Sequence, residues 1–559
     1  MQANTSLNSP ELVLKGNRIS PGLASGTVWV SSDILDFSAE AYRIQPDQVE
    51  AEMERIRRAF GQVIADLDEA ARRLSEQIDP SLAEIFRAHQ LMLENLLSSN
   101  EFETELRDSL SNAAEAVKKV FREWQAKFAA IENETIRERA DDIFDLGRRV
   151  LRRLESTEAF GLAGMPAGSI LVAQRLLPSD IVAISPTGVK AIVVESLGQG
   201  SHAALLAREK GIPALAGLPG LLRQIRRGDE ALVDAFREEL IISPNVETRR
   251  DFEQRIESYR ASLLVCKGEC DKPAITRNGQ AIAVEANLTA YATVDAILGS
   301  GADGVGLFRI EELYLTRDVP PSEEELFNDL QHLVAPLREK PVTIRLLDIG
   351  GDKAIPSLRF PAQSNPLLGR RGVRVLLAYP QLARTQLKTL LRLSQAQDIR
   401  ILVPMVTFER EMEQMRELIL AIAHEMGIKK VPPLGAMIET PAAALTVGQI
   451  SLYADFFSVG TNDLTQYTLV AGRDDATVSD YYDETHSSIL RLLGIIVREA
   501  AGKPVTICGE LAGREEAIPK LLELGFRRLS ISPSLIPTTK ELIRSIDTKN
   551  PEGTSTLAV

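Results

Sequence analysis

Two carboxylates, Glu439 and Asp463, stand at the ends of two neighbouring apolar runs of the sequence. Residues 434–438 lead directly into Glu439, and residues 455–460 lead into a loop that contains Asp463. A short apolar run that ends in glycine and polar residues is typical of a buried strand that opens into a loop. Oxygen ligands at adjacent strand ends suit a hard cation such as Mg²⁺. Carboxylates at such ends also cap helices, so the pair alone leaves both interpretations open.

The elements that position these carboxylates belong to a regular alternation of strand-like and helical patterns in the second half of the chain. The eight strand-like runs are 281–286, 304–308, 342–347, 399–405, 434–438, 455–460, 504–508 and 528–532. Helical patterns such as 322–339, 408–426 and 485–501 lie between them. Eight such units in about 290 residues predict a closed (β/α)₈ barrel.

Polar residues gather where the strands of this barrel end, which is where barrel enzymes build their active sites. They are Arg309, Arg345, Asp348, Glu439, Asn462, Asp463, Arg473 and Cys508. A single arginine is usually a surface ion pair, but three at one rim form a clamp for phosphate and carboxylate oxygens. The pattern predicts a small ligand with both groups, bridged by a divalent metal. Cys508 is either an inert buried thiol or a group that transfers a proton.

The first half of the chain predicts an α/β unit interrupted by helices. Residues 27–30, 169–173 and 191–194 have strand-like composition, whereas residues 46–157 hold only two glycines and two prolines and repeat apolar residues at helical spacing. This block predicts a bundle of antiparallel helices. We therefore expect an α/β domain over 1–45 and 158–244, an inserted helical domain over 46–157, a polar helical linker over 245–270, the barrel over 271–548 and a disordered tail over 549–559.

His202 has an unusual setting among the five histidines of the chain. It follows strand 191–194 and a glycine-containing loop, and Ser201 before it is a candidate N-cap for a helix. An imidazole in the first turn of a helix, once phosphorylated, would be an anion at a helix N-terminus. The local sequence supports two interpretations equally: a phosphorylated histidine, and a histidine that only completes a helix cap.

Composition excludes several classes of protein. The net charge of −14 argues against a nucleic-acid surface, and no apolar stretch reaches the roughly 20 residues of a membrane helix. Three cysteines, Cys266, Cys270 and Cys508, make no disulfide framework, and the first residues lack the features of a signal peptide. We expect a cytoplasmic protein in which Cys266 and Cys270 are incidental thiols, with metal binding by this pair as the alternative.

The chain resembles enzyme I of the bacterial phosphotransferase system, the phosphoenolpyruvate-protein phosphotransferases, from Ser20 to about Ile546. The residues that carry the resemblance are the stretches 20–26, 301–309, 348–353, 460–467 and 508–513, with sequences SPGLASG, GADGVGLFR, DIGGDK, GTNDLTQY and CGELAG. These motifs are long and occur in the same order as in the family.

The resemblance implies a role for each candidate. His202 would take the phosphoryl group, and Cys508 would donate the proton that converts enolpyruvate to pyruvate. Phosphoenolpyruvate would be held by Arg309, Arg345, Asn462, Asp463 and Arg473, with Mg²⁺ on Glu439 and Asp463. The family is dimeric through the barrel and passes its phosphoryl group to the small histidine phosphocarrier HPr, which docks on the helical insertion. The phosphohistidine domain would swivel between barrel and carrier.

The sequence departs from the family pattern at several positions. Leu197 and Gly200 replace a glycine and a threonine before His202, Asp474 and Asp475 follow Arg473, Ser487 and Ser488 replace Pro-Ala, and Arg514 stands where an acid is common. These changes indicate a divergent member. They keep open a regulatory or non-sugar paralogue, or a scaffold with weakened catalysis. A pyruvate dikinase or phosphoenolpyruvate synthase is a further alternative, although the chain lacks the phosphate-binding loop of a nucleotide domain.

Overall fold

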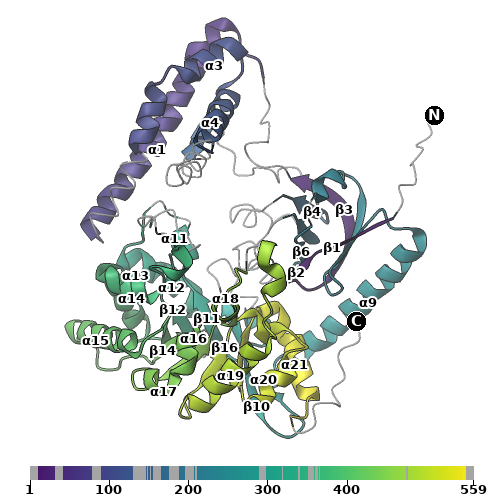
Figure 1. The fold of residues 1–559 in the computed structure, drawn as a ribbon, viewed down its shortest axis with the longest axis vertical. Helices are drawn as coiled ribbons and strands as arrows, with labels where there is room; N and C mark the ends of the chain where they lie inside the picture. The colour runs from purple at the N-terminus through teal and green to yellow at the C-terminus, as the bar shows by residue number, and fades with distance from the viewer. Residues whose placement is uncertain are drawn as a thin grey trace.

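The structure is a computed structural model with two sheets and a separate group of helices (Figure 1). It describes residues 11–31, 42–77, 90–129, 146–147, 149–151, 153–154, 165–174, 188–195, 207, 211–218, 220–288, 297–315, 317, 319–337, 340–350, 358, 363, 365–473 and 476–548. No helix within these ranges combines the length and apolar character that a bilayer crossing requires.

The first sheet has eight strands, which come from both sides of the helical block. They are β1 (Leu12–Lys15), β2 (Asn17–Ser20), β3 (Leu23–Ser31), β4 (Ile170–Ala173), β5 (Ala191–Val194), β6 (Ala214–Ala216), β7 (Glu230–Asp234) and β8 (Glu239–Ile242). Their order is β1-β8-β7-β3-β4-β5-β6-β2. β3 pairs in parallel with β4, with Val28 opposite Ile170, although the inserted helices separate these two strands in the sequence. Buried β4 and β5 are apolar throughout, as strands covered on both faces must be.

The helical block contains α1 (Val49–Gln77), α3 (Glu101–Ser109) and α4 (Ala113–Ala129), with further helix over residues 90–98. In Figure 1 these helices stand apart from both sheets. Ile56, Phe60, Val63 and Leu67 form the buried stripe of α1, which confirms the helical spacing expected there. Phe60 and Phe102 meet edge to face, with ring centroids 5.2 Å apart.

The second sheet is a closed barrel of eight parallel strands, which confirms the predicted (β/α)₈ fold. The strands are β10 (Ala281–Leu288), β11 (Val305–Arg309), β12 (Val342–Arg345), β13 (Ile399–Val403), β14 (Leu434–Ile438), β15 (Phe456–Val459), β16 (Val505–Ile507) and β17 (Arg528–Ile531). β10 pairs in parallel with both β11 and β17, and this closes the ring. The short β9 (Ala274–Ile275) adds an antiparallel edge to β10.

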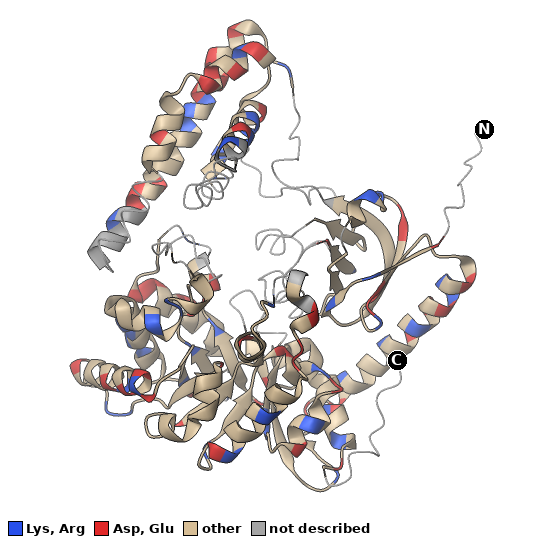
Figure 2. Ribbon diagram, in the orientation of Figure 1, with Lys and Arg blue, Asp and Glu red and all other residues tan. Residues whose placement is uncertain are grey.

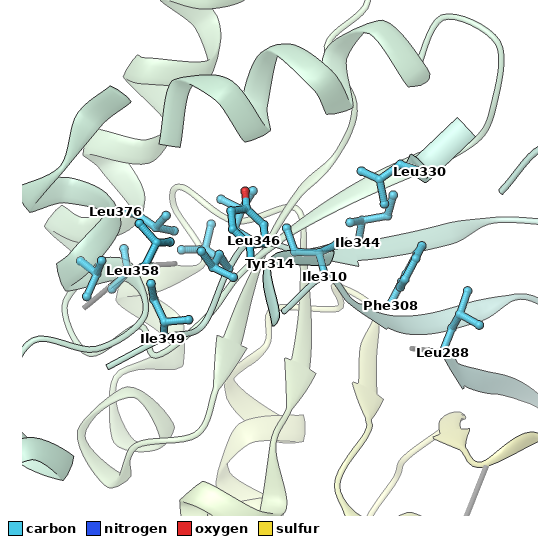
Figure 3. Packing of buried hydrophobic residues seen from close by; sticks show 14 of the residues in the cluster. Leu288, Phe308, Ile310, Tyr314, Leu330, Ile344, Leu346, Ile349, Leu358 and Leu376 are labelled. Carbon is cyan, nitrogen blue, oxygen red and sulfur yellow. The ribbon is translucent and has the colours of Figure 1, made fainter. Parts of the chain in front are cut away.

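Helices surround the barrel and bury its outer face. They are α11 (Glu312–Leu315), α12 (Glu323–Val334), α13 (Val373–Ala378), α14 (Pro380–Leu393), α15 (Glu409–Glu425), α16 (Pro441–Leu445), α17 (Val447–Ile450), α18 (Thr461–Leu469), α19 (Ser487–Glu499), α20 (Ile518–Glu523) and α21 (Ile536–Ser545). Figure 3 shows how Phe308 and Ile344 of neighbouring strands pack beside Leu330 of α12. This apolar layer holds the strand ends, and the side chains on them, in fixed positions.

One helix, α9 (Val246–Gly268), joins the two sheets. Asn245 caps it by accepting hydrogen bonds from the backbone N–H groups of Glu247 and Thr248, both at 2.9 Å. Phe252 and Ile256 pack its first half against the first sheet, β1–β8, which we call the small sheet. The surface of α9 mixes acidic and basic residues (Figure 2). α9 lies within the range expected as a helical linker, 245–270, and the expected tail at 549–559 lies outside the described residues.

Candidate active site

The structure places Glu439 and Asp463 together at the rim of the barrel. Glu439 directly follows β14, and Asp463 lies in the first turn of α18, just after the neighbouring strand β15. Both are buried, with exposed fractions of 1% and 6%. Glu439 Oε1 accepts a hydrogen bond from the Met405 backbone N–H at 2.6 Å. A Cβ at Gly460 would lie 2.8 Å from Glu439 Oε2, so glycine lets the loop pass close over this carboxylate.

These two carboxylates repel one another in a water-poor setting. Burial raises the pKa of Glu439 to about 7, and the charges of Asp463 and Asp348 act in the same direction, against the opposing Arg345 and Arg371. When two neighbouring carboxylates repel each other, a bound cation lowers the free energy of the ionised pair, so such pairs are typical of cation sites. Among the described residues, however, no cluster of three or more His, Cys, Asp or Glu side chains is arranged to hold a metal ion by itself.

Arg371 is a site residue that sequence reasoning missed. Its Nη1 and Nη2 donate to the two carboxylate oxygens of Asp463 at 2.9 and 2.8 Å, and its Nε and Nη2 donate to Asp348 at 3.2 Å each. It also donates to the Tyr467 hydroxyl at 3.1 Å. Burial acts to lower the pKa of Arg371, but Asp348 and Asp463 outweigh it and hold that pKa well above its ordinary value. The available sequence signal was a pair of arginines between Gly369 and Gly372, in the loop after β12.

Two of the three arginines of the predicted anion clamp lie on adjacent strands. Arg309 ends β11 and lies opposite Arg345 of β12 in the strand register. Arg345 is buried, with Nη2 2.7 Å from Glu311 Oε1 and Nη1 3.3 Å from Asp348 Oδ2. Arg345 Nε is also buried, and no hydrogen-bond acceptor within the described ranges reaches it. A buried donor without an acceptor is costly, and a ligand anion at this rim would supply one.

Asn462 and Arg473 lie near the same rim, on the segment that follows β15. The Asn462 amide donates to Glu510 Oε1 at 3.2 Å and accepts from the Glu510 backbone N–H at 2.9 Å, which ties α18 to the loop after β16. The Arg473 backbone N–H donates to Gln466 Oε1 at 3.2 Å. Asp474 and Asp475, which follow Arg473, lie outside the described residues.

Cys508 lies at the end of β16, beneath this rim. Burial raises the pKa of its thiol to about 11, against the lowering effects of a hydrogen bond from Ser458 and the charge of Arg309. Cys508 and Arg309 also line a cavity of about 680 Å³ that runs between the barrel, α9 and the small sheet. Residues of the small sheet, Arg18 and Pro21, form part of its opposite wall. The barrel rim therefore borders a cavity that residues of the small sheet also line.

His202 lies outside the described residues, together with the loop that departs from the family pattern at Leu197 and Gly200. The described strand that leads toward it, β5, ends at Val194, and the next described strand, β6, begins at Ala214. The position of the imidazole relative to the barrel therefore stays a prediction.

Comparisons with known proteins match almost the whole chain. Residues 15–139, 165–238 and 266–548 match the N-terminal, mobile and PEP-binding domains of the PEP-utilising enzymes. The phosphoenolpyruvate-protein phosphotransferase of Bacillus subtilis is 32% identical over 97% of this chain and 95% of its own. The proteins of that name from Listeria monocytogenes and Haemophilus influenzae are 33% and 31% identical, each over 96% of this chain and 94% of their own. The chain therefore belongs to the family of the phosphoenolpyruvate-protein phosphotransferases.

Proposed function

We propose that the protein transfers the phosphoryl group of phosphoenolpyruvate to its own His202 and then to a histidine of a small HPr-like carrier, releasing pyruvate, in a sugar phosphotransferase system. The observation that supports this most directly is the composition of the barrel rim. A buried guanidinium, Arg345, has an unsatisfied donor there, beside two carboxylates whose mutual repulsion favours a cation. Phosphoenolpyruvate would supply an acceptor for this donor, and a divalent metal would supply a cation beside these carboxylates.

The rim residues fit Mg²⁺, with Glu439 and Asp463 as its protein ligands. Both are oxygen donors, and Mg²⁺ is commonly held by one or two carboxylates together with substrate phosphate and water. The pKa of Glu439, raised to about 7, falls when a cation binds beside it, because the cation favours the carboxylate. Bound there, Mg²⁺ would help to offset the charge of the transferring phosphoryl group.

The chain's own residues supply the rest of the chemistry. Arg309, Arg345 and Arg473 bind the phosphate and carboxylate of the substrate, and Asn462 orients it. Neutral His202 attacks phosphorus, so that the P–O bond to the enol oxygen breaks as the N–P bond forms. Positioning and electrostatic stabilisation dominate this step. Cys508 then gives its proton to C3 of the enolate, which leaves as pyruvate.

The domain organisation provides a route from the barrel to the carrier. We assign residues 1–45 and 158–244 to the phosphohistidine domain, 46–157 to carrier docking, 245–270 to the linker and 271–548 to the substrate barrel. His202 must visit both the barrel and the carrier, so the phosphohistidine domain moves about α9. We further propose a homodimer formed through the barrel and a cytoplasmic location, in keeping with three buried cysteines that form no disulfide.

Labelling tests this function directly. Incubation with phosphoenolpyruvate labelled in its phosphoryl group, with Mg²⁺, should give an acid-labile label on the protein that an HPr-type carrier removes. His202→Ala should abolish the label. His332→Ala, which changes a histidine of α12 on the outside of the barrel, is the matched control and should keep it. Label that persists in His202→Ala would refute the proposal.

A further inference from the structure

The thiol of Cys508 is held between two groups of the neighbouring strand β15. The Ser458 hydroxyl donates to Cys508 Sγ at 3.2 Å, and Sγ lies 3.3 Å from the carbonyl oxygen of Val459, to which the thiol donates. The Cys508 backbone N–H also donates to the Val459 carbonyl, at 3.0 Å. These contacts fix the sulfur from two sides, in a position that is 2% exposed.

Strand register explains why these two side chains meet. Ser458 of β15 lies opposite Thr506 of β16, and Cys508 is two residues beyond Thr506. Side chains two apart along a strand point to the same face, so Cys508 and Ser458 share one. Ser458 also lies opposite Met437 of β14 and two residues after Phe456. Met437, Phe456 and Cys508 belong to one apolar cluster, and Ser458 places a hydroxyl against that cluster.

A buried hydroxyl against an apolar cluster has an energetic cost unless it makes a hydrogen bond. Ser458 is 1% exposed, and within the described ranges its only recorded side-chain hydrogen bond is to Cys508 Sγ. The bond is weak while sulfur is protonated, because a thiol is a poor acceptor. It becomes a charge-assisted bond when sulfur carries a negative charge. The Ser458 hydroxyl therefore favours the thiolate, whereas burial and the bond to the Val459 carbonyl favour the thiol.

We propose that Ser458 is a positioning residue for proton transfer by Cys508. This rests on the proposed function, in which Cys508 protonates the enolate. In that step the S–H bond breaks and its electron pair stays on sulfur, while the enolate uses its carbon–carbon π pair to form the new C3–H bond. The Ser458 hydroxyl stabilises the resulting thiolate, and a proton from water restores the thiol once pyruvate has left.

Kinetics of Ser458→Ala test the proposal. Loss of a hydrogen bond to a charged group should slow pyruvate formation by about tenfold to a hundredfold, while KM for phosphoenolpyruvate changes by less than about twofold. The solvent deuterium isotope effect on pyruvate formation should rise, because protonation then limits the rate. Ser458→Thr, which retains the hydroxyl, should recover most of the rate. A wild-type rate and isotope effect in Ser458→Ala would overturn the proposal.

Two further measurements separate positioning from general damage. Thr343→Val removes another buried hydroxyl, from β12, which neighbours neither β15 nor β16, and it should leave the isotope effect unchanged. Thiolate absorbance can be titrated without substrate in a Cys266→Ala, Cys270→Ala background, in which Cys508 is the remaining cysteine. There Ser458→Ala should raise the pKa of Cys508 by about one unit, a tenfold effect. An unchanged pKa would refute the role of Ser458.

The role of Cys508 itself is tested separately. If Cys508→Ala forms pyruvate at the wild-type rate, Cys508 is not the proton donor and the proposed role of Ser458 in catalysis fails with it. The thiolate titration would still report whether the hydroxyl acts on the sulfur. Loss of label from His202→Ala is independent of both results, so failure of the phosphotransfer scheme can be recognised on its own.

Discussion

At the scale of single residues, Glu439 couples the stability of the metal-free protein to pH. Its pKa is raised from the ordinary 4.5 to about 7 by burial and by neighbouring carboxylates. Because the folded-state pKa is the higher one, the protonated carboxyl contributes stability below pH 4.5, and this contribution is lost as pH rises through 7. Loss of the Glu439 proton in the folded protein is therefore unfavourable. Glutamine, which is uncharged and has the same shape, avoids this cost.

We therefore predict a pH-dependent effect of Glu439→Gln. Thermal unfolding with a chelator present should show the variant more stable than the wild type at pH 8, by of the order of 2 kcal/mol, and equal to it near pH 5. Added Mg²⁺ should stabilise the wild type and leave the variant unaffected. An equal difference at both pH values would show that the effect is one of packing and not of charge.

The buried Arg371 should be a much larger determinant of stability than an exposed arginine. Arg371→Met leaves Asp348 and Asp463 buried without their shared cation, and breaking such a pair costs about 3–5 kcal/mol. Arg384→Met is the matched control, because Arg384 pairs with Glu425 at the surface and such pairs contribute about 0–1 kcal/mol. Urea unfolding of both variants measures the difference. Similar losses would mean that Arg371 is not the structural cation of the rim.

At the scale of elements, the barrel strands were predictable and the loops between them were not. Residues 434–438 were expected as a strand and form β14 with the same bounds, because a strand covered on both faces is a continuous apolar run. The strand ends then gave Glu439 and Asp463. Arg371 escaped because its role depends on the path of the loop after β12, which brings it to Asp463, 92 residues later in the chain. The amino-acid composition does not predict the path of this loop.

Arg514, which stands where an acid is common in the family, has an ion-pair partner that the sequence did not indicate. Its Nη2 lies 2.8 Å from Glu484 Oε2, and the Glu484 side chain is almost fully buried. Glu484 Oε1 also accepts from the Thr461 hydroxyl at 3.4 Å, at the start of α18. Burial acts to lower the pKa of Arg514, but Glu484 and Glu510 outweigh it and raise that pKa. The ion pair therefore ties the loop after β16 to the segment before α19, beside the helix turn that presents Asn462 and Asp463.

We predict that Arg514→Gln disturbs this turn. Glu484 would stay buried without a cation, which should lower stability by about 2 kcal/mol and raise KM for phosphoenolpyruvate several-fold. The double variant Arg514→Gln, Glu484→Gln should recover part of both losses, because no unpaired charge remains. Lys520→Gln, which breaks an exposed pair with Glu523, is the control and should change neither quantity. Strictly additive effects of the two substitutions would argue against coupling between Arg514 and Glu484.

At the scale of the whole molecule, the small sheet contacts both α9 and the barrel, and the described contacts differ in kind. Phe252 and Ile256 of α9 are buried against Leu232 and Ile241 of the sheet. Direct contact between sheet and barrel includes the partly exposed ion pair of Arg18 with Glu516, at 3.2 Å. Such an exposed ion pair contributes little, whereas the buried apolar contact with α9 contributes more. We expect the sheet and the first half of α9 to move together.

A cross-link across this contact should block the reaction cycle. A Cβ at Gly211 would lie 3.1 Å from Ser534 Cβ, so a separation of the two segments by about 0.7 Å gives the Cβ distance of about 3.8 Å that is typical of a disulfide. Gly211 has a φ of +61°, where a cysteine is strained by about 1–3 kcal/mol, which the fold can absorb. The native cysteines are buried and would not compete for the new thiols.

The oxidised Gly211→Cys, Ser534→Cys protein should retain at most one of the two half-reactions. It should either take label from phosphoenolpyruvate or exchange label with the carrier, because His202 needs one domain orientation for each step. Reductant should restore the complete transfer, and Ser534→Cys alone, treated with the same oxidant, should behave as the wild type. If the cross-linked protein passes label from phosphoenolpyruvate to the carrier at the reduced protein's rate, then His202 reaches both partners without displacement of the small sheet, and the motion about α9 is not part of the cycle.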